Sequence, residues 1–366
     1  MQKLKILTIF GTRPEVIKLA PFIKVVEEDS GCDSITCATT QQRELQNDVL
    51  NLFNIKADYD LEIMQDGQDL FHITESILHK IKDVLKIENP NVIVVQGDTT
   101  TAFSTALAGF YCKIPVVHIE AGLRTGNVYS PYPEEMNRCL ISKLATLHMA
   151  PTQASVDNLA KEGVHQKVFN VGNTIVDAVH WILKNAKASS FVEKIIGTKK
   201  NVVLITVHRR ENFGEPLLTI CDAIKNLCES YPEYTFVWPV HPNPNVKDIV
   251  YQRLQGIHNL DLTSPLSYAD LILLINVSKV ILSDSGGIQE ESCILGKKII
   301  VLREDTERPE VIESGYGMLV GADKRKILSA FEKFIDITID NEFRHVYGKP
   351  GVSERILTKI KENLLI

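Results

Sequence analysis

The sequence predicts an α/β protein built from two doubly wound domains. Short apolar runs rich in Val, Ile and Leu recur along the chain, and each is followed by a turn and an amphipathic helical pattern. Strands that are apolar throughout and alternate with helices are typical of parallel sheets covered on both faces. The pattern starts again near residue 201, and a length of 366 residues suits two domains better than one core.

Two sets of apolar segments define the domains. The first set of expected strands lies at residues 4–10, 34–39, 91–96, 115–119, 146–150 and 167–171. The second set lies at residues 201–207, 235–240, 259–263, 279–284, 298–302 and 317–320. We therefore predict an N-terminal domain over 1–171 and a C-terminal domain over 172–352. The amphipathic helix expected at 353–366 is predicted to pack back on the first domain.

Composition excludes several classes of protein. The net charge is −6, whereas nucleic-acid-binding domains are usually basic. No apolar run reaches the roughly 18 residues that a membrane-spanning helix needs, so no membrane partner is predicted. The seven cysteines are scattered without a CxxC pair, which favours reduced thiols and a cytoplasmic location. No His/Cys cluster has metal-ligand spacing, so we predict no metal site.

Three carboxylates lie at strand ends in the first half. Asp98 follows the strand at 91–96, Glu120 follows the strand at 115–119, and Glu134 stands at a proline-led helix start. Taken alone, Asp98 is equally well explained as a helix N-cap and Glu134 as a helix-capping anion. Glu120, however, is costly beside a buried strand unless it is paired or functional. Together, the three predict an acid/base site.

Basic residues follow strands in both halves. GTRPE, residues 11–15, provides Arg13, and Lys18 comes one helical turn later. In the second half, HRREN provides His208 and Arg209, and His241 opens HPNP. These side chains are expected at the carboxyl edges of the sheets, where doubly wound folds bind ligands.

A glycine turn in the second half has the chemistry of an anion site. Ser285, Gly286 and Gly287 begin a helix directly after the strand at 279–284, so backbone N–H groups and the helix dipole would face a phosphate. Glu291, one turn further on, is placed to accept hydrogen bonds from a ribose diol, and Arg308 follows in REDTERPE. This division of charge fits a nucleoside-diphosphate sugar. Because neither GxGxxG nor GxxxxGK[ST] is present, we predict no dinucleotide cofactor and no P-loop.

In this order, the motifs resemble those of the non-hydrolysing UDP-N-acetylglucosamine 2-epimerases. The resemblance covers nearly the whole chain and rests on FGTRPEVIKLAP, GDTTTA, HIEAGLRTG, YSPYPEEMNR, VGNTIVDA, TVHRREN, HPNPNV, LSDSGGIQEES and REDTERPE. It implies the GT-B fold, with two Rossmann-like domains facing across a cleft. It also implies interconversion of UDP-GlcNAc and UDP-ManNAc by anti elimination of UDP and re-addition to 2-acetamidoglucal, for cell-surface polysaccharide synthesis.

The resemblance assigns roles to the candidate residues. Catalysis would fall to Asp98, Glu120, Glu134, His208 and Lys18. Substrate binding would fall to Arg13, Lys18, His208, Ser285, Gly286, Gly287, Glu291 and Arg308. A second UDP-GlcNAc, acting as an activator, would lie among Gln41, Glu134, Arg209 and His241. The expected assembly is a homodimer, and no cofactor is implied.

Other functions remain as alternatives. A hydrolysing epimerase would release free sugar and UDP, but such relatives usually differ at Pro14–Glu15. A 2,3-diacetamido-uronate nucleotide 2-epimerase is disfavoured by Glu15. A retaining glycosyltransferase of the same fold leaves the acidic strand ends unexplained, and a non-catalytic UDP-sugar-binding protein predicts the loss of at least one of these acids. All three are present.

Overall fold

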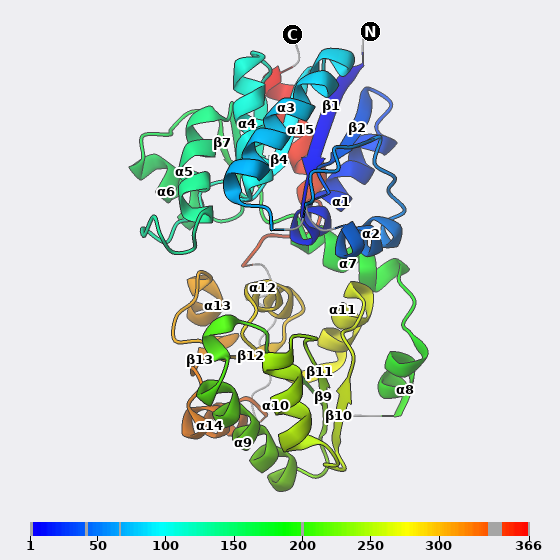
Figure 1. Cartoon of the computed structure of the whole chain (residues 1–366), viewed down its shortest axis with the longest axis vertical. Helices are drawn as coiled ribbons and strands as arrows, with labels where there is room; N and C mark the ends of the chain where they lie inside the picture. Colours follow the sequence, from blue (N-terminus) through cyan, green and yellow to red (C-terminus); the bar gives the residue numbers. More distant parts are fainter. Residues whose placement is uncertain (1–2, 41–42, 66, 199–200, 336–345, 365–366) are drawn as a thin grey trace. The chain divides into compact units, whose positions relative to one another are not determined.

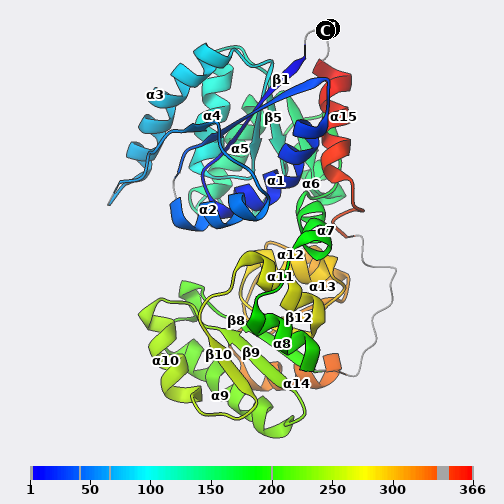
Figure 2. The ribbon, with the colours of Figure 1, turned by 90° about the vertical axis from the view of Figure 1, so that its right-hand side faces the viewer.

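The computed structural model describes residues 3–40, 43–65, 67–198, 201–335 and 346–364. The chain divides into two compact units, one comprising Met1–Trp181 with Tyr347–Ile366 and the other comprising Ile182–Val346. Each unit contains one parallel sheet between two layers of helices (Figures 1 and 2). The predicted α/β class with two doubly wound sheets is therefore confirmed.

The first sheet has the strand order β3-β2-β1-β4-β5-β6-β7. Every neighbouring pair in it is parallel. Its strands are β1 (Leu4–Phe10), β2 (Cys32–Ala38), β3 (Tyr59–Asp60), β4 (Val92–Gln96), β5 (Val116–Ile119), β6 (Leu147–Ala150) and β7 (Val168–Asn170). The sequence did not predict β3, because two residues are too few to show a strand pattern.

Helices cover both faces of the first sheet. They are α1 (Arg13–Glu28), α2 (Arg43–Leu52), α3 (Leu70–Glu88), α4 (Thr100–Tyr111), α5 (Glu134–Leu144), α6 (Gln153–Lys161) and α15 (Val352–Leu364). Helix α7 (Ile175–Asn185) begins in the first unit and ends in the second. Helices α3, α4 and α5 pack side by side and share one apolar cluster with the sheet. The α3 contribution is a stripe at helical spacing, formed by Ile73, Ile77, Ile81 and Val84. Helices α1, α2 and α15 pack against one another as a second group.

The C-terminal segment belongs to the first unit. Helix α15 packs on α1, and Lys361 forms an ion pair with Asp29 at 2.6 Å. Asp177 on α7 accepts the backbone N–H groups of Gly351 at 2.8 Å and Ser353 at 2.7 Å, at the start of α15. Because these bonds tie the first turns of α7 to the tail, the unit extends to Trp181, beyond the sequence-based boundary at 171.

The second sheet has the strand order β10-β9-β8-β11-β12-β13 and is also entirely parallel. Its strands are β8 (Val202–Thr206), β9 (Thr235–Pro239), β10 (Leu260–Thr263), β11 (Ser278–Ser283), β12 (Lys298–Val301) and β13 (Gly317–Leu319). Its helices are α8 (Ser190–Thr198), the 3-10 turn η1 (Arg210–Asn212), α9 (Glu215–Ser230), α10 (Pro244–Leu254), α11 (Tyr268–Val277), α12 (Gly286–Ile294), α13 (Pro309–Glu313) and α14 (Lys324–Ile335).

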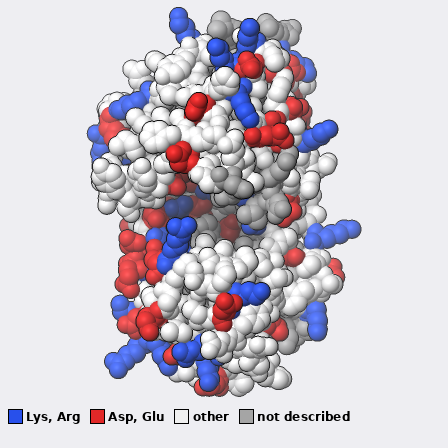
Figure 3. Space-filling model, in the orientation of Figure 1, with Lys and Arg blue, Asp and Glu red and all other residues white. Residues whose placement is uncertain are grey.

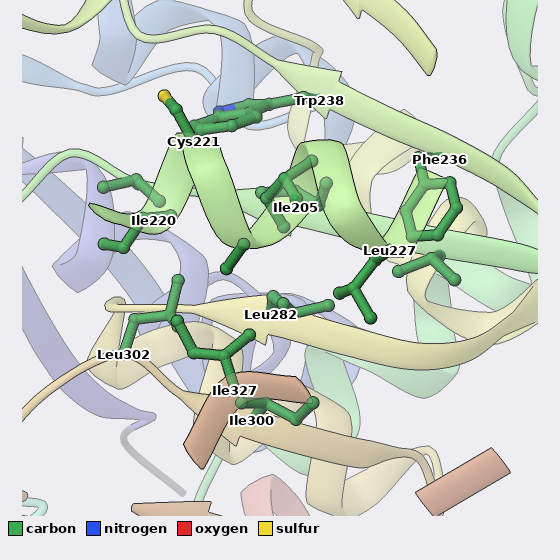
Figure 4. Close-up of a cluster of buried hydrophobic side chains, with 14 of the residues drawn as sticks. Ile205, Ile220, Cys221, Leu227, Phe236, Trp238, Leu282, Ile300, Leu302 and Ile327 are labelled. Carbon is green, nitrogen blue, oxygen red and sulfur yellow. The ribbon is translucent and has the colours of Figure 1, made fainter. Parts of the chain in front are cut away.

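The core of the second unit lies between α9 and the sheet (Figure 4). Helix α9 buries a stripe at helical spacing, formed by Leu217, Ile220, Cys221, Ile224, Leu227 and Cys228. Trp238 and Phe236 on β9, together with Ile205 on β8, are fully buried in the same cluster. This packing holds the strand ends of β8 and β9 in fixed positions, and the basic motifs follow those ends.

Both sheets have a topological switch point, where the strand order changes direction. In the first sheet it lies between β1 and β4, and in the second between β8 and β11. Doubly wound folds bind ligands at the carboxyl ends of the strands on either side of this point. The turns after these four strands are therefore the first places to look for a site.

The surface carries both signs of charge. On the face shown in Figure 3, basic and acidic side chains are interspersed. Within the described ranges, no helix is long and apolar enough to span a bilayer. All seven cysteines are free thiols, and all are buried except the exposed Cys112 and the half-buried Cys139.

Candidate active site

The turn after β1 is tightly packed. A side chain at Gly11 would overlap the hydroxyls of Thr39 and Thr101, so only glycine fits there. Thr12 is the N-cap of α1, and Pro14 stands in the first helical turn, as the sequence predicted. Arg13 is the first residue of α1 and is half-buried.

Glu15 lies inside this turn with 1% of its surface exposed. Its Oε2 accepts hydrogen bonds from Gly11 N at 3.0 Å, Thr12 N at 2.7 Å and Thr12 Oγ1 at 2.8 Å. Its Oε1 accepts one from Thr99 Oγ1 at 2.7 Å, in the turn after β4. Burial raises the pKa of Glu15 to about 7, although all four hydrogen bonds favour the charged form.

Glu120 is held from two sides at the end of β5. Lys18 Nζ on α1 lies 2.5 Å from Glu120 Oε1 in a buried ion pair, and Gln96 Nε2 at the end of β4 donates to Oε2. The backbone of Glu120 has φ +67°, a conformation that is uncommon for a residue other than glycine. The strand ends thus bring together Lys18 and Glu120, two of the predicted catalytic residues.

Asp98 is paired with Arg138 on α5. Arg138 Nε donates to Asp98 Oδ2 at 2.7 Å, and Asn137 Nδ2 donates to the Asp98 carbonyl at 2.9 Å. The alternative interpretation of Asp98 as a helix N-cap is wrong, because Thr99 caps α4 by accepting from Ala102 N at 3.0 Å. The carboxylate of Asp98 is thereby left to the site, about one quarter exposed at 24%.

The loop between β5 and α5 is held by Glu135 and not by Glu134. Glu135 is buried, accepts from Thr125 N and Gly126 N at 3.0 Å each, and pairs with Arg138 at 2.9 Å. Glu134 begins α5 and is half-buried, and no described residue forms a hydrogen bond or ion pair with it. A predicted site carboxylate is therefore available at this edge of the sheet.

Two further residues support this region. The guanidinium of Arg124 pairs with Glu162 at 2.6 Å. His118 on β5 is fully buried, and its Nε2 donates to the Gly97 carbonyl at 2.7 Å. Burial lowers the pKa of His118 to about 3, so this ring is a neutral support for the turn that carries Asp98.

In the second unit, Asp284 supports the turn after β8. Its carboxylate is fully buried and accepts from His208 N at 3.0 Å, Arg209 N at 2.9 Å and Asn212 Nδ2 at 2.9 Å. The ring of His208 lies 3.2 Å from Asp284 and stacks on His241, with 6.0 Å between the ring centroids. Burial lowers the pKa of His208, and Asp284 opposes this shift.

Helix α12 begins directly after β11, as predicted. Ser285 is its N-cap, and Gly286 and Gly287 form its first turn, where backbone N–H groups have no partner within the helix. A Cβ at Gly286 would lie 3.6 Å from the Arg308 guanidinium and 3.8 Å from Arg209 Nη2, so two cations flank the turn. A glycine turn flanked by cations at a helix N-terminus is suited to an anion.

Several other predicted residues are accounted for. Glu291 is buried in α12 and accepts from the Tyr268 hydroxyl at 2.8 Å. Arg308 pairs with Glu290 at 2.8 Å. His241 is exposed beside His208. Gln41, predicted for the activator site, lies outside the described residues.

Sequence reasoning missed the residues that hold the site in place. Gln96, Asp284 and Tyr268 were not predicted to contact it, and Glu15 was noted only as a family marker. Asp284 had a visible signal, since it directly precedes Ser285–Gly287 at a strand end. In the part of the chain that the structure covers, no group of three His, Cys, Asp or Glu side chains is arranged to hold a metal ion.

Comparisons with known proteins identify relatives of this chain. The family model described as UDP-N-acetylglucosamine 2-epimerase matches residues 24–361. A UDP-N-acetylglucosamine 2-epimerase of Campylobacter jejuni is 48% identical over 343 residues, which is 91% of this chain and 90% of that protein. One from Yersinia pestis is 44% identical over 374 residues, covering 98% of this chain and 99% of that protein.

Solved structures agree as well. The UDP-GlcNAc 2-epimerase of Neisseria meningitidis, bound to UDP-GlcNAc, has a TM-score of 0.89 and 43% identity, covering 98% of this chain and all of that one (100%). The Methanocaldococcus jannaschii enzyme in complex with UDP-GlcNAc and UDP has a TM-score of 0.84 at 34% identity, with coverage of 98% and 100%. These likenesses extend over both units and support the two-domain GT-B fold. The chain therefore belongs to the UDP-N-acetylglucosamine 2-epimerase family.

Proposed function

We propose that the protein is a non-hydrolysing UDP-N-acetylglucosamine 2-epimerase that interconverts UDP-GlcNAc and UDP-ManNAc. The single observation that carries the proposal is the grouping of Asp98, Glu120 and Lys18 at the carboxyl edge of the first sheet, in a chain of this family. Charged groups at that edge lie where doubly wound folds hold their ligands. The second unit contributes the complementary anion site.

The first chemical step is elimination of UDP. The C1–O bond of the sugar breaks and UDP leaves with the electron pair, so that C1 acquires oxocarbenium character. The proton at C2 becomes acidic only then, and a carboxylate removes it as the C1–C2 double bond of 2-acetamidoglucal forms. Asp98, Glu120 and Glu134 are the candidate acids and bases, and their negative charge also stabilises the cationic transition state.

The second step reverses the first on the other face of the sugar. The UDP oxygen attacks C1, and a carboxylic acid returns a proton to C2 from the face opposite to the one that lost it. UDP must stay bound between the two steps, because without it the glucal would have no nucleotide to add at C1 and would be released as a free product. The proposal therefore requires many contacts to the diphosphate and a site closed to water.

The proposed diphosphate contacts are backbone N–H groups and basic side chains. Gly286 and Gly287 present backbone N–H groups, with Ser285 at the cap and Arg308 beside them. His208, Arg13 and Lys18 supply the remaining polar contacts to the departing group. Glu291, which also accepts from the Tyr268 hydroxyl at 2.8 Å, would accept from the ribose hydroxyls.

The deciding experiment follows the C2 proton. The protein is incubated with UDP-GlcNAc in deuterated water, and the products are followed by proton NMR. We expect deuterium at C2 and a mixture of both sugar nucleotides. Accumulation of UDP and free ManNAc would establish the hydrolysing reaction, and absence of any turnover with retained UDP binding would establish a non-catalytic binding protein. Turnover of a 2,3-diacetamido-uronate nucleotide alone would reassign the substrate.

An activator site is a further part of the proposal. A second UDP-GlcNAc would contact Glu134, Arg209 and His241, together with Gln41. Support comes from Glu134, which no described side chain engages, and from the adjacent rings of His208 and His241. Activation predicts sigmoidal dependence of the UDP-ManNAc reaction on added UDP-GlcNAc. In His241→Ala this dependence should weaken while turnover of UDP-GlcNAc persists.

We also propose a homodimer in the cytoplasm that supplies ManNAc units for surface polysaccharide. The end of α4 exposes two adjacent aromatic side chains, Phe110 at 60% and Tyr111 at 68%, with 6.2 Å between the ring centroids. Apolar patches of this kind mark contact surfaces. Sedimentation velocity should give twice the monomer mass, and Phe110→Glu should shift the protein to monomer.

A further inference from the structure

The inference concerns Glu15, a buried carboxylate that the proposed chemistry does not use. Its two oxygens contact two different turns. Oε2 accepts three hydrogen bonds from Gly11 and Thr12 in the turn after β1, and Oε1 accepts one from Thr99 in the turn after β4. These are the two turns of the switch point in the first sheet.

Helix capping alone does not explain this arrangement. A glutamate at the third helical position needs to accept only the N-cap N–H, which Glu15 does through Thr12 N. Glu15 also binds Gly11 N, outside the helix, and Thr99 Oγ1, 84 residues further along the chain. The bonds from Gly11 N and Thr99 Oγ1 therefore come from outside the N-cap residue and lie beyond what a capping box provides.

The position also opposes ionisation. Burial raises the pKa of Glu15 to about 7, and among the described residues no cation pairs with it, so only neutral donors hold its charge. A capping glutamate could remain at the surface without this penalty. The cost of burial is therefore set against the connection that this acid makes between two segments.

The connection reaches two site residues. Arg13 follows Thr12 directly, and Asp98 precedes Thr99 directly. The other side of the Asp98 turn is held by α5, through Arg138 on the carboxylate and Asn137 on the carbonyl. His118 on β5 also supports this turn through the Gly97 carbonyl. Without Glu15, the turn would keep these contacts but would lose its link to the Arg13 turn.

We propose that Glu15 is a positioning residue. Its carboxylate hydrogen-bonds to both the Arg13 turn and the Asp98 turn, and this link, the Glu15 clasp, sets the distance between a diphosphate contact and a catalytic acid. This rests on the proposed function, because Arg13 and Asp98 have those roles only in the epimerase reaction. Glu15 itself touches neither the sugar nor UDP. Small displacements of catalytic groups cost about 10²-fold in rate.

The test shortens the clasp while keeping its charge. Glu15→Asp lacks one methylene and cannot reach Thr99 and the Gly11–Thr12 turn together. We expect kcat per folded molecule to fall about ten- to hundredfold, with KM changed less than about threefold. The matched control is Glu28→Gln, an exposed glutamate at the end of the same helix, which should leave both constants unchanged.

The second side of the clasp is tested at Thr99. Thr99→Val removes the hydroxyl, which also caps α4, and should lower kcat to a similar extent, whereas Thr99→Ser restores both contacts and should retain kcat within about threefold. If the two side chains act through one contact, the double variant Glu15→Asp/Thr99→Val is no slower than the slower single variant. If Thr99→Val acted only by removing the cap of α4, its loss of kcat would instead multiply with the loss caused by Glu15→Asp.

The outcomes separate this proposal from the epimerase assignment. Deuterium incorporation by the wild-type protein tests the assignment first. If the wild-type protein incorporates deuterium, three results would each contradict the proposed role of Glu15. They are an unchanged kcat in Glu15→Asp, losses of kcat that multiply in the double variant, and equal losses of kcat in Thr99→Ser and Thr99→Val. Should Glu15→Asp fail to fold, the Thr99 Ser/Val pair decides, with folded fraction measured by near-ultraviolet circular dichroism.

Discussion

The two switch points of the molecule use a buried carboxylate in opposite ways. In the first unit, Glu15 fills the N-terminus of α1 and binds the N–H groups of Gly11 and Thr12. In the second unit, Asp284 turns away from α12 and binds the N–H groups of His208 and Arg209 in the neighbouring turn.

Because of this difference, the N–H groups at the two helix starts differ in whether a ligand can reach them. The Glu15 carboxylate already accepts the N–H groups before α1, so these N–H groups are not open to an external phosphate. The start of α12 has glycine N–H groups and flanking cations, and Asp284 is engaged by the neighbouring turn. In the proposed reaction the first unit would supply the carboxylates, with Arg13 and Lys18 as basic groups, and the second unit would supply the glycine turn for the diphosphate.

The largest expected effect comes from a variant that loses catalysis and keeps its affinity for UDP. Glu120→Gln removes a candidate acid but keeps a hydrogen-bonding group beside Lys18. Turnover and C2 deuterium exchange should fall by about 10²–10⁴, because general acid/base catalysis is lost. Isothermal titration should give a UDP Kd within about threefold of wild type. Retained deuterium exchange would assign the proton transfer to other residues.

The next largest effect is a difference in the free energy of unfolding between alanine variants of the two glycine turns. Gly11→Ala should lower the free energy of unfolding by about 1–3 kcal/mol, because its Cβ would overlap the hydroxyls of Thr39 and Thr101. Gly287→Ala should change it by less than about 0.5 kcal/mol, because the nearest atom to its Cβ is Ser285 Oγ at 4.0 Å. Urea unfolding of both variants checks this, and equal losses would show that the turns are equally packed.

A smaller effect concerns the anion site alone. Gly287→Val places a branched side chain over the first turn of α12, where UDP phosphates are proposed to bind. We expect UDP affinity to fall about tenfold, which is about 1.4 kcal/mol, while the thermal midpoint changes little. Titration calorimetry with UDP measures the loss. The control for general effects of valine is Gly197→Val, at an exposed position of α8 in the same unit where a Cβ meets no atom within 4 Å. Unchanged affinity would move the phosphate site away from α12.

The smallest effect is a difference between the units in how the free energy of unfolding depends on pH. In the second unit, burial lowers the pKa of His208, but Asp284 opposes this shift. In the first unit, burial lowers the pKa of His118 to about 3 and of His148 to about 4. Between pH 6.5 and pH 4 the unfolded chain binds these protons and the folded unit does not, so stability falls as pH falls. The raised pKa of Glu15 acts in the opposite direction between about 4.5 and 7.

The Glu15 contribution cancels when a variant is compared with wild type. His148→Gln should reduce the loss of stability between pH 6.5 and 5.5 by about 1 kcal/mol, since each proton contributes about 1.4 kcal/mol per pH unit. Urea unfolding at both pH values measures the difference. An identical slope in the variant would mean that His148 is protonated in the folded unit.

Much of the fold and part of the site could be predicted from the sequence. Long apolar strands such as β4 and β11 have an unmistakable pattern, and the polar turns after them mark the sheet edge. Asp98, Glu120 and Ser285–Gly287 were found because they follow such strands directly. The two-residue strand β3 and the cap at Thr99 were not found, since neither has a pattern that distinguishes it from its neighbours.

By itself, the sequence determined the two sheets, the edge where polar groups gather and the type of charge that each half contributes. These depend on local order along the chain, which periodicity and turn residues encode. Only the tertiary structure decided the partners: Lys18 with Glu120, Arg138 with Asp98, and Glu15 with Thr99. Such pairs join residues 40 to 102 positions apart, and only the register of neighbouring strands brings them within hydrogen-bonding distance.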